Sequence, residues 1–341
     1  MAAIKIVEYT PDRLPDLVAS YASAVVTTPH CHPGDGSVED WTAELADLAA
    51  EATAAGTKEC SSRKILLAEG GADGALLGFV DVCVWAAHTA TEWGAGSTGS
   101  RIDVAPRGLL RFLWCERGQR GAGEALVDAA EAHVSAAGMV DMSAFDQGFR
   151  YEFYMIDSAY YSLANNHVLS LLEARGYVRC NGECYYDWPK YTIPDDLAPL
   201  PEGLQFRVVT IPGKRRLPGT AVYAVSEDGE DLGVCLTTSA GEFSESAVAS
   251  ATCFTNWLGV PVSPTSTRLH PSQGQGLGKC LLAESLRQMK TLGYEHAAIS
   301  TALMNHKAQL FYSNFGYDFT GWTVGLERSL VDKGQSTAPR L

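Results

Sequence analysis

The stretch Gln273-Gly274-Gln275-Gly276-Leu277-Gly278 decides the interpretation of this chain. Three glycines on alternate positions let the backbone turn tightly and approach a ligand. Apolar residues then recur at helical spacing from Leu277 to Met289, which predicts a helix directly after the loop. A helix start presents unpaired N–H groups and the positive end of the helix dipole, so it suits a phosphate or pyrophosphate. The stretch lacks both the P-loop motif and the dinucleotide fingerprint.

The residues after this loop follow a specific order. We expect the helix to end at Gly293, a short buried strand over His296–Thr301, and a second helix over Asn305–Phe315 closed by Gly316. The Q-x-x-G-x-G of the loop, followed by Asn305-x-x-Ala308-x-x-x-Tyr312-x-x-x-Gly316-Tyr317, resembles the acyl-CoA signature of the GNAT N-acetyltransferases. The resemblance covers roughly the last eighty residues of the chain.

The first half of the chain repeats the pattern of the second. Asn165 to Gly176 has the same length as Asn305 to Gly316, and Gly121/Gly123 has the spacing of Gly276/Gly278. This indicates an internal duplication across a proline-rich linker. The predicted fold class is α/β, with two GNAT-like domains, each a mixed, mostly antiparallel sheet flanked by helices. The expected boundaries are an N-terminal domain over 1–190, a linker over 191–201, a C-terminal domain over 202–330 and a tail over 331–341.

The two copies differ in complementary ways. Gly118 and Leu172 stand in the first copy where the second has Gln273 and Tyr312. The second copy has only residues 211–219 where the first has two early helices, which in GNAT enzymes cover the acceptor site. We therefore expect the C-terminal domain to be catalytic, and the N-terminal domain to serve substrate recognition with a degraded acetyl-CoA site. An aromatic and acidic segment over 146–161 has no counterpart, and either holds an organic cation or seals the interface with its aromatic rings.

The resemblance also implies roles for single residues. Tyr312 would be the general acid that protonates the leaving thiolate, although a buried core aromatic is the alternative interpretation. Asn305 would bind the pantetheine arm of the cofactor or merely cap its helix. The pyrophosphate of acetyl-CoA would lie on the loop and the helix start, whose residues are Gln273, Gly274, Gln275, Gly276, Leu277, Gly278 and Lys279.

The general base is less well defined by the sequence. Glu242 is our tentative assignment, because its loop carries a carboxylate that would receive an amine proton through water. Glu245, His270 and His296 remain open alternatives.

Charge and composition limit the partners. The formal net charge is −14, and residues 1–194 hold 26 acidic but only 14 basic residues. This argues against nucleic acid, which needs a basic surface, and favours a small cationic amine as acceptor. A solvated acidic surface that serves only solubility is the alternative.

Several other features narrow the class of protein. The nine cysteines lack paired ligand spacing, so we expect reduced thiols and no metal; Cys180, Cys184 and the His30-Cys31-His32 run lack second-half partners. No apolar run is long enough to cross a membrane and no signal peptide is evident, so we expect a cytoplasmic protein, monomer or homodimer. Acetyl transfer to a small-molecule amine is the predicted function. A non-catalytic acyl-CoA sensor on the same scaffold is the alternative.

Overall fold

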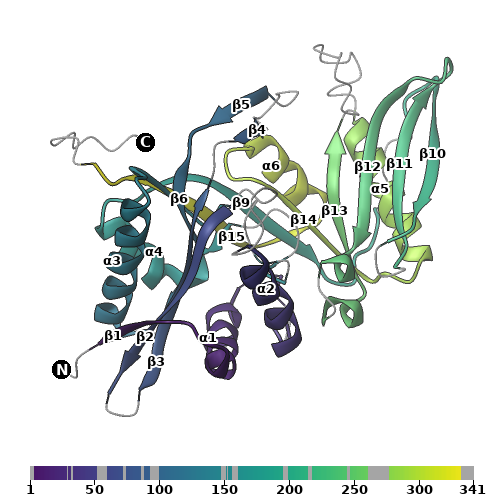
Figure 1. Cartoon of the computed structure of the whole chain (residues 1–341). Coiled ribbons are helices and arrows are strands. Elements are labelled where there is room, and N and C mark those ends of the chain that lie inside the picture. The colour runs from purple at the N-terminus through teal and green to yellow at the C-terminus, as the bar shows by residue number, and fades with distance from the viewer. Residues whose placement is uncertain are drawn as a thin grey trace.

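The computed structural model describes residues 4–28, 30–31, 34–51, 60–71, 74–85, 88–92, 100–146, 151, 153–155, 160–194, 199–213, 217–243, 246–259 and 276–331. Helices and strands alternate through both halves of the chain, which confirms the α/β class (Figure 1). The elements of the first half are β1 (Lys5–Glu8), α1 (Leu14–Val25), α2 (Val38–Glu51), β2 (Cys60–Gly70), β3 (Ala75–Trp85), β4 (His88–Glu92), β5 (Ser100–Val104), β6 (Arg107–Cys115), α3 (Arg120–Ala136), β7 (Asp141–Ala144), β8 (Tyr161–Ser162), α4 (Asn166–Ala174) and β9 (Val178–Trp188).

The second half has the same order without two early helices among its described residues. Its elements are β10 (Leu204–Ile211), β11 (Gly219–Ser226), β12 (Asp231–Ser239), β13 (Thr252–Gly259), α5 (Leu277–Thr291), β14 (His296–Ala302), α6 (His306–Phe315) and β15 (Asp318–Ser329). Two short 3-10 turns, Ala240–Glu242 and Ser246–Ser250, connect β12 to β13. The sequence offers two candidates, Phe254–Val262 and Thr267–His270, for the strand before the glycine loop. Strand β13 begins close to the first candidate, and the second lies outside the described residues.

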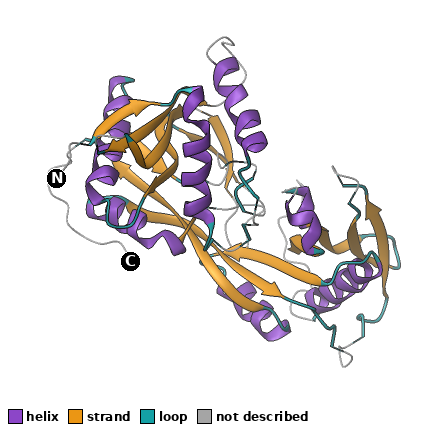
Figure 2. Cartoon of the chain, turned by 90° about the horizontal axis from the view of Figure 1, so that it is seen from below, coloured by secondary structure: helices purple, strands orange, loops and turns teal. Residues whose placement is uncertain are grey.

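One sheet runs through both halves. Its strand order is β1-β2-β3-β6-β7-β15-β9-β14-β13-β12-β11-β10, and β8 pairs with β15. The last strand of each half has therefore crossed over: β9 of the first half lies beside β14 of the second, and β15 of the second half lies beside β7 of the first. We call β9 and β15 the bridging strands. Figure 2 shows both of them running from one lobe of the molecule into the other.

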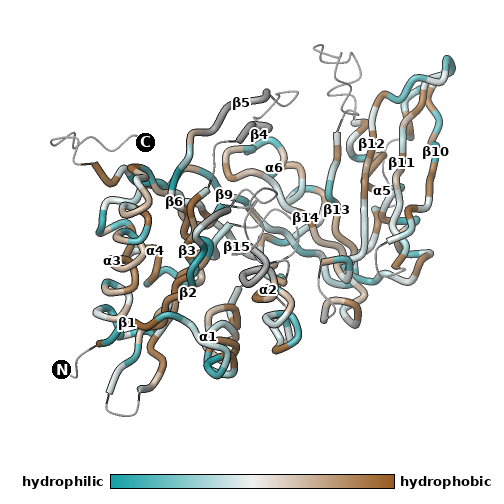
Figure 3. Tube along the Cα trace, in the orientation of Figure 1, coloured by the Kyte–Doolittle hydropathy of each residue, from teal (hydrophilic) through white to brown (hydrophobic). Residues whose placement is uncertain are grey.

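The bridging strands join two hydrophobic cores. The first core packs below α1 and α3 and includes Val324 and Leu326 of β15. The second packs below α5 and α6 and includes Cys184 and Tyr186 of β9. Consecutive side chains of a strand point to opposite faces, so Tyr185 enters the first core while Tyr186 enters the second. Apolar stretches follow the strands that line both cores (Figure 3).

Two negative observations concern the described residues only. No helix there is long and apolar enough to cross a membrane. No disulfide joins the cysteines at positions 31, 83, 115, 180, 184, 235, 253 and 280, and no cluster of His, Cys, Asp and Glu suited to a metal ion was found in this part of the chain.

Candidate acyl-transfer site

Strands β13 and β14 pair only at their beginnings. Their parallel register runs from Thr252 opposite His296 to Thr255 opposite Ile299. Beyond that point β13 continues to Gly259 beside β12, while β14 continues to Ala302 beside β9. The two strands thus diverge at their carboxyl ends, and beyond that point they do not pair with each other. Backbone groups on such diverging edges are suited to bind an extended ligand arm.

Helix α5 begins beside this divergence without a side-chain cap. Its N-cap residue is Gly276, whose φ of +83° is the left-handed conformation that glycine adopts without strain. The N–H groups of Leu277 and Gly278 follow in the first turn, where a helix has no internal acceptors. A side chain added at Gly278 would meet its nearest described neighbour, Phe311, only at 4.0 Å. Among the described residues, nothing crowds this helix start. Gln273, Gly274 and Gln275 lie outside the described residues.

Helix α6 positions Tyr312. The side chain of Asn305 accepts a hydrogen bond from the N–H of Ala308 at 3.3 Å, so Asn305 caps this helix, as one of the two expectations had it. At the other end, Gly316 and Tyr317 donate to the carbonyl of Tyr312. The ring of Tyr312 is 7% exposed and packs edge-on against Tyr186 of β9, with 5.8 Å between the ring centres.

The surroundings of Tyr312 keep its hydroxyl protonated. Burial raises the pKa of Tyr312 well above its ordinary value, and the nearby Cys235 thiol and Glu183 carboxylate act in the same direction. Tyr312 packs in the same core as Cys235 of β12 and Tyr186 of β9, so its side chain lies on the α6 face of the sheet, near the two strands that flank the divergence. A phenol with a raised pKa is a weaker acid than free tyrosine, but it keeps its proton available for a leaving group throughout the neutral range.

The candidate bases lie elsewhere. A side chain at Gly213 would collide with the carboxylate of Glu242, so Glu242 lies at the sheet end where β13 and β14 begin. His296 accepts a hydrogen bond from the backbone of Lys190 at that same end. The strands diverge at the opposite end, so the structure does not bring Glu242 or His296 to Tyr312, and their role as base stays a prediction. Glu245 and His270 lie outside the described residues.

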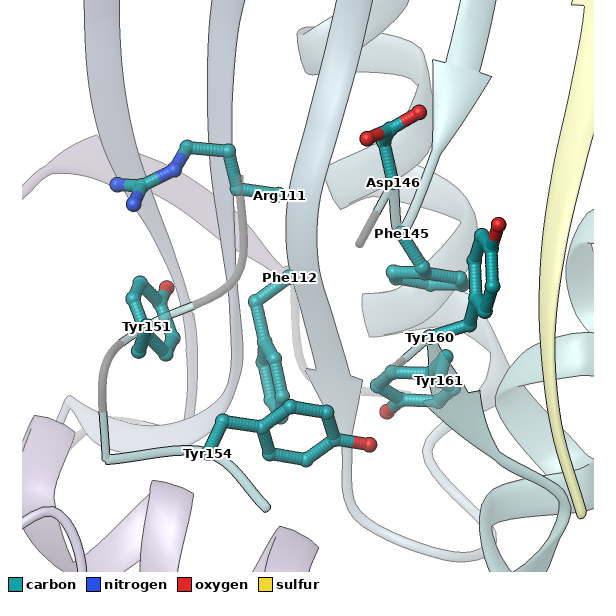
Figure 4. A pocket seen from close by; sticks show the side chains of 8 residues that line it. All are labelled: Arg111, Phe112, Phe145, Asp146, Tyr151, Tyr154, Tyr160 and Tyr161. Atoms are coloured by element: carbon teal, nitrogen blue, oxygen red, sulfur yellow. The ribbon is translucent and has the colours of Figure 1, made fainter. Parts of the chain in front are cut away.

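The equivalent place in the first half is filled by protein. Strands β6 and β7 also diverge, after Leu110 and Ala144. There Tyr161 stacks on Phe145 at 4.0 Å, and its hydroxyl donates to the carbonyl of Leu113 on β6 at 2.5 Å. The cavity left among the side chains of Figure 4 has a volume of only about 10 Å³. That is space for about one water molecule, too little for a pantetheine arm.

The glycines of the first half also serve packing. A side chain at Gly123 would lie 2.6 Å from Leu171 and 2.9 Å from the Cys115 thiol, so Gly123 lets α3 approach its neighbours. At the start of α3, the carbonyl of Gln119 accepts hydrogen bonds from the N–H groups three and four residues later. The carbonyl of Gly276 accepts the equivalent pair of bonds at the start of α5. Gly121 therefore corresponds to Gly278, which corrects the alignment expected from the sequence by two residues. Leu172, at the position of Tyr312, is fully buried.

Most of the described aromatic residues in the stretch 146–161 belong to the first core. Tyr151, Phe153, Tyr154 and Tyr161 are all buried there. Tyr151 also donates a hydrogen bond to Asp81, at 3.0 Å, within a buried ionic cluster. In that cluster Arg63 and Arg111 both contact Asp81 and Glu44. These rings seal the first half internally, so they are not an open cation site.

Sequence reasoning missed one residue near the site. Glu183 lies on a strand of the first half, and no local pattern indicates that this strand pairs inside the second half. The sequence predicts a last strand of the first copy over Cys184–Trp188 but does not indicate its partner. In the structure that partner is β14 of the second half.

Comparison with known proteins supports the fold. By sequence, no protein-family model matches the chain, and neither does any curated protein. Solved structures are similar. A GCN5-related N-acetyltransferase from Sphaerobacter thermophilus is 15% identical, with a TM-score of 0.55 over 96% of each chain. A tandem GNAT protein from the clavulanic acid biosynthesis pathway is 13% identical, with a TM-score of 0.60 over 97% of this chain and 100% of its own.

A third similar structure is the GCN5-related glucosamine N-acetyltransferase region of a fungal multi-domain GH3 β-N-acetylglucosaminidase. It is 14% identical, with a TM-score of 0.58, and the match covers 96% of this chain and 38% of that one. The chain therefore has the fold of the GNAT N-acetyltransferases, in its tandem form.

Proposed function

We propose that this protein transfers an acetyl group from acetyl-CoA to the amine of a small cationic molecule, at a single site in its second half. The observation that carries the proposal is the coincidence of three features in that half. They are the diverging strands β13 and β14, the uncapped glycine start of α5, and the buried, protonated Tyr312 between them.

The residues present fit acetyl-CoA as cosubstrate. The first turn of α5 offers backbone N–H groups and the helix dipole to the pyrophosphate, and Lys279 adds a positive charge there. The freed edges of β13 and β14 offer hydrogen bonds to the pantetheine amides. Tyr312 then holds its proton where the thiolate leaves.

The first half binds no cofactor in this proposal, because side chains fill the space where β6 and β7 diverge. The acidic balance of residues 1–194 favours a positively charged acceptor held near the junction of the halves. The cytoplasm, where acetyl-CoA and reduced thiols coexist, is the compartment that fits both the cosubstrate and the free cysteines.

A calorimetric titration tests the cofactor site. We expect one acetyl-CoA per chain in the wild type and none in a Gly278→Val variant, because a side chain there fits the protein but blocks the approach of a phosphate. Gly123→Ala is unsuitable as a control since it would clash. Gly138→Ala, at an open turn after α3 with φ +81°, serves instead: it costs about 1–2 kcal/mol of backbone strain and keeps full binding. Binding that survives Gly278→Val would place the cofactor elsewhere and contradict the proposal.

The alternative function is a sensor that binds acyl-CoA without turnover. The intact Tyr312 argues against it, since binding alone does not need a buried proton donor. A wild type that binds acetyl-CoA but acetylates no member of an amine library would favour the sensor.

A further inference from the structure

Bridging strand β9 carries a carboxylate to the candidate site. In the sheet register, Glu183 of β9 stands opposite Ala302 of β14 on one side and Thr323 of β15 on the other. Strand β14 leaves β13 after Ile299, so Ala302 and its neighbour Glu183 lie beyond the point of divergence. This is the open end of the site, where a thioester and an acceptor would meet.

Glu183 faces away from α5 and α6. Its neighbour Cys184 packs in the core beneath those helices, and side chains alternate along a strand. The position of Tyr160 agrees with this direction. Its ring lies against Gly325, and Gly325 pairs with Asn181. Asn181 is two residues before Glu183, so both side chains are on the same face of β9. Tyr312 approaches the diverging strands from the α6 face, so Glu183 and Tyr312 flank them from opposite faces.

The charge of Glu183 acts on tyrosines of both halves. Burial is the main cause that raises the pKa of Tyr312, and Glu183 contributes to it. The same holds for Tyr160, where Asp146 contributes as well. The carboxylate therefore lies within electrostatic range of the proton donor in the second half and of an aromatic ring from the first.

The other carboxylate of β9 lies within the paired part of the sheet. Asp187 of β9 stands opposite Ala298, within the paired part of β14, and lies 3.3 Å from His30. Glu242 lies at the far end of the strands. Of the two carboxylates of β9, Glu183 is thus the one that the register brings to the open end.

We propose that Glu183, supplied by the first half, binds the ammonium group of the acceptor and removes its proton in the site of the second half. This assignment rests on the proposed acetyl transfer. One proton passes from the ammonium to the carboxylate, and the freed nitrogen lone pair forms the bond to the acetyl carbon. The carbon–sulfur bond breaks, and its electron pair leaves with the thiolate. Tyr312 protonates the thiolate and recovers a proton from the nitrogen, so the products are an amide, free CoA and one proton.

The experiment compares Glu183→Gln with wild type on an amine that the wild type acetylates. We expect kcat/KM to fall by about 10²- to 10⁴-fold at neutral pH, as for the loss of a general base, with acetyl-CoA affinity unchanged. The deficit should shrink as pH rises towards the pKa of the amine, because the variant depends on amine that is already neutral in solution. A merely structural defect would not depend on pH in this way.

The matched control is Glu327→Gln, which removes the same charge from an exposed carboxylate of β15 that pairs with Arg107. We expect wild-type kcat/KM from it. Equal activity of Glu183→Gln and wild type would overturn the role of Glu183 while leaving acetyl transfer intact. A wild type that acetylates no amine, despite binding acetyl-CoA, would overturn both proposals, so the two failures are distinguishable. A pH-independent loss would reduce Glu183 to a structural residue and also overturn the assignment.

Discussion

At the scale of single residues, equal positions in the two halves have opposite fates. Tyr312 and Leu172 occupy the same place in their helices, yet Tyr312 brings a hydroxyl into its core while Leu172 brings only apolar groups. The sequence was sufficient to predict this contrast, because the spacing from Asn305 to Gly316 and from Asn165 to Gly176 fixes the comparison.

We expect Tyr312→Phe to lower kcat by about 10²-fold or more, the usual effect of losing a general acid, without changing acetyl-CoA affinity. Because the pKa of Tyr312 is raised, its acid form persists through pH of about 10, so wild-type kcat should not decline below that pH through this group. Steady-state kinetics measures kcat, and calorimetry measures the affinity for acetyl-CoA.

The control is Tyr191→Phe, which removes a hydroxyl from the same core. That hydroxyl donates a hydrogen bond to the carbonyl of Leu286. This control should lose about 1 kcal/mol of stability and keep full activity. Unchanged kcat in Tyr312→Phe would contradict its role as the acid.

The buried cluster around Asp81 makes a prediction about stability. Burial by itself would raise the pKa of Asp81, but Arg63 and Arg111 outweigh it and lower the pKa. A carboxyl whose pKa is lower in the folded than in the unfolded protein stabilises the fold at pH values above the unfolded pKa of about 3.9. This contribution is lost as the pH falls through the folded pKa.

Asp81→Asn should therefore reduce the free energy of unfolding at neutral pH by about 3–5 kcal/mol, since it leaves two buried arginines short of a partner. Denaturant unfolding at pH 7 and at about pH 3 measures the effect, which should be smaller at the lower pH. Asp231→Asn, in an exposed pair with Arg207, should cost less than about 1 kcal/mol. A comparable loss in the two variants would show that the buried cluster contributes nothing special.

At the scale of elements, helix ends were more predictable than strand partners. The cap at Asn305 and the stop at Gly316 are local signals, and α6 begins and ends where they indicate. The partner of β9 is not a local property. Its residues alternate between two cores, and the same pattern would fit a strand inside its own half. The cofactor-binding residues expected before Gly276, which are Gln273, Gly274 and Gln275, stay predictions. The spacing of glycines does not determine the path that the backbone takes through a loop.

Two glycines that end the helices of the second half offer a test of how α6 is held. Gly316 has φ +130°, and an added side chain would lie 2.7 Å from the ring of Trp188 on β9. Gly293, after α5, has φ +96° and nothing within 4 Å. Gly293→Ala should lose about 1–2 kcal/mol from backbone strain alone.

Gly316→Ala should lose about 1–3 kcal/mol more through overpacking against β9, and it should also lower kcat by shifting the helix that carries Tyr312. Thermal unfolding and kinetics of the two variants measure the difference. If the two variants lose equal stability and keep equal activity, the contact between α6 and β9 does not position the site.

At the scale of the whole molecule, the sequence predicted two related halves but not their shared sheet. Composition and repeat spacing describe each copy separately, whereas strand exchange depends on which edges meet in three dimensions. The salt bridge between Arg328 of β15 and Glu131 of α3 adds a further tie across the halves. The predicted boundary over 191–201 separates the copies in sequence, while the bridging strands join them in space.

We therefore expect residues 1–201 and 202–341, expressed separately, to remain expanded and to bind a hydrophobic dye. The first piece lacks Val324 and Leu326 of its core, and the second lacks Cys184 and Tyr186. Co-expression should restore one compact complex that binds acetyl-CoA. Circular dichroism, gel filtration and calorimetry report the outcome; cooperative unfolding of either piece alone would contradict it.

The position of β15 also bears on synthesis. Domains usually fold from the N-terminus as the ribosome releases them, at about 5–20 residues per second. Strand β7 already pairs with β6 of its own half, but it meets its second neighbour only when Leu326–Ser329 of β15 have emerged. The first half, although made first, waits with an open sheet edge at β7 until the last strand of the second half has been made.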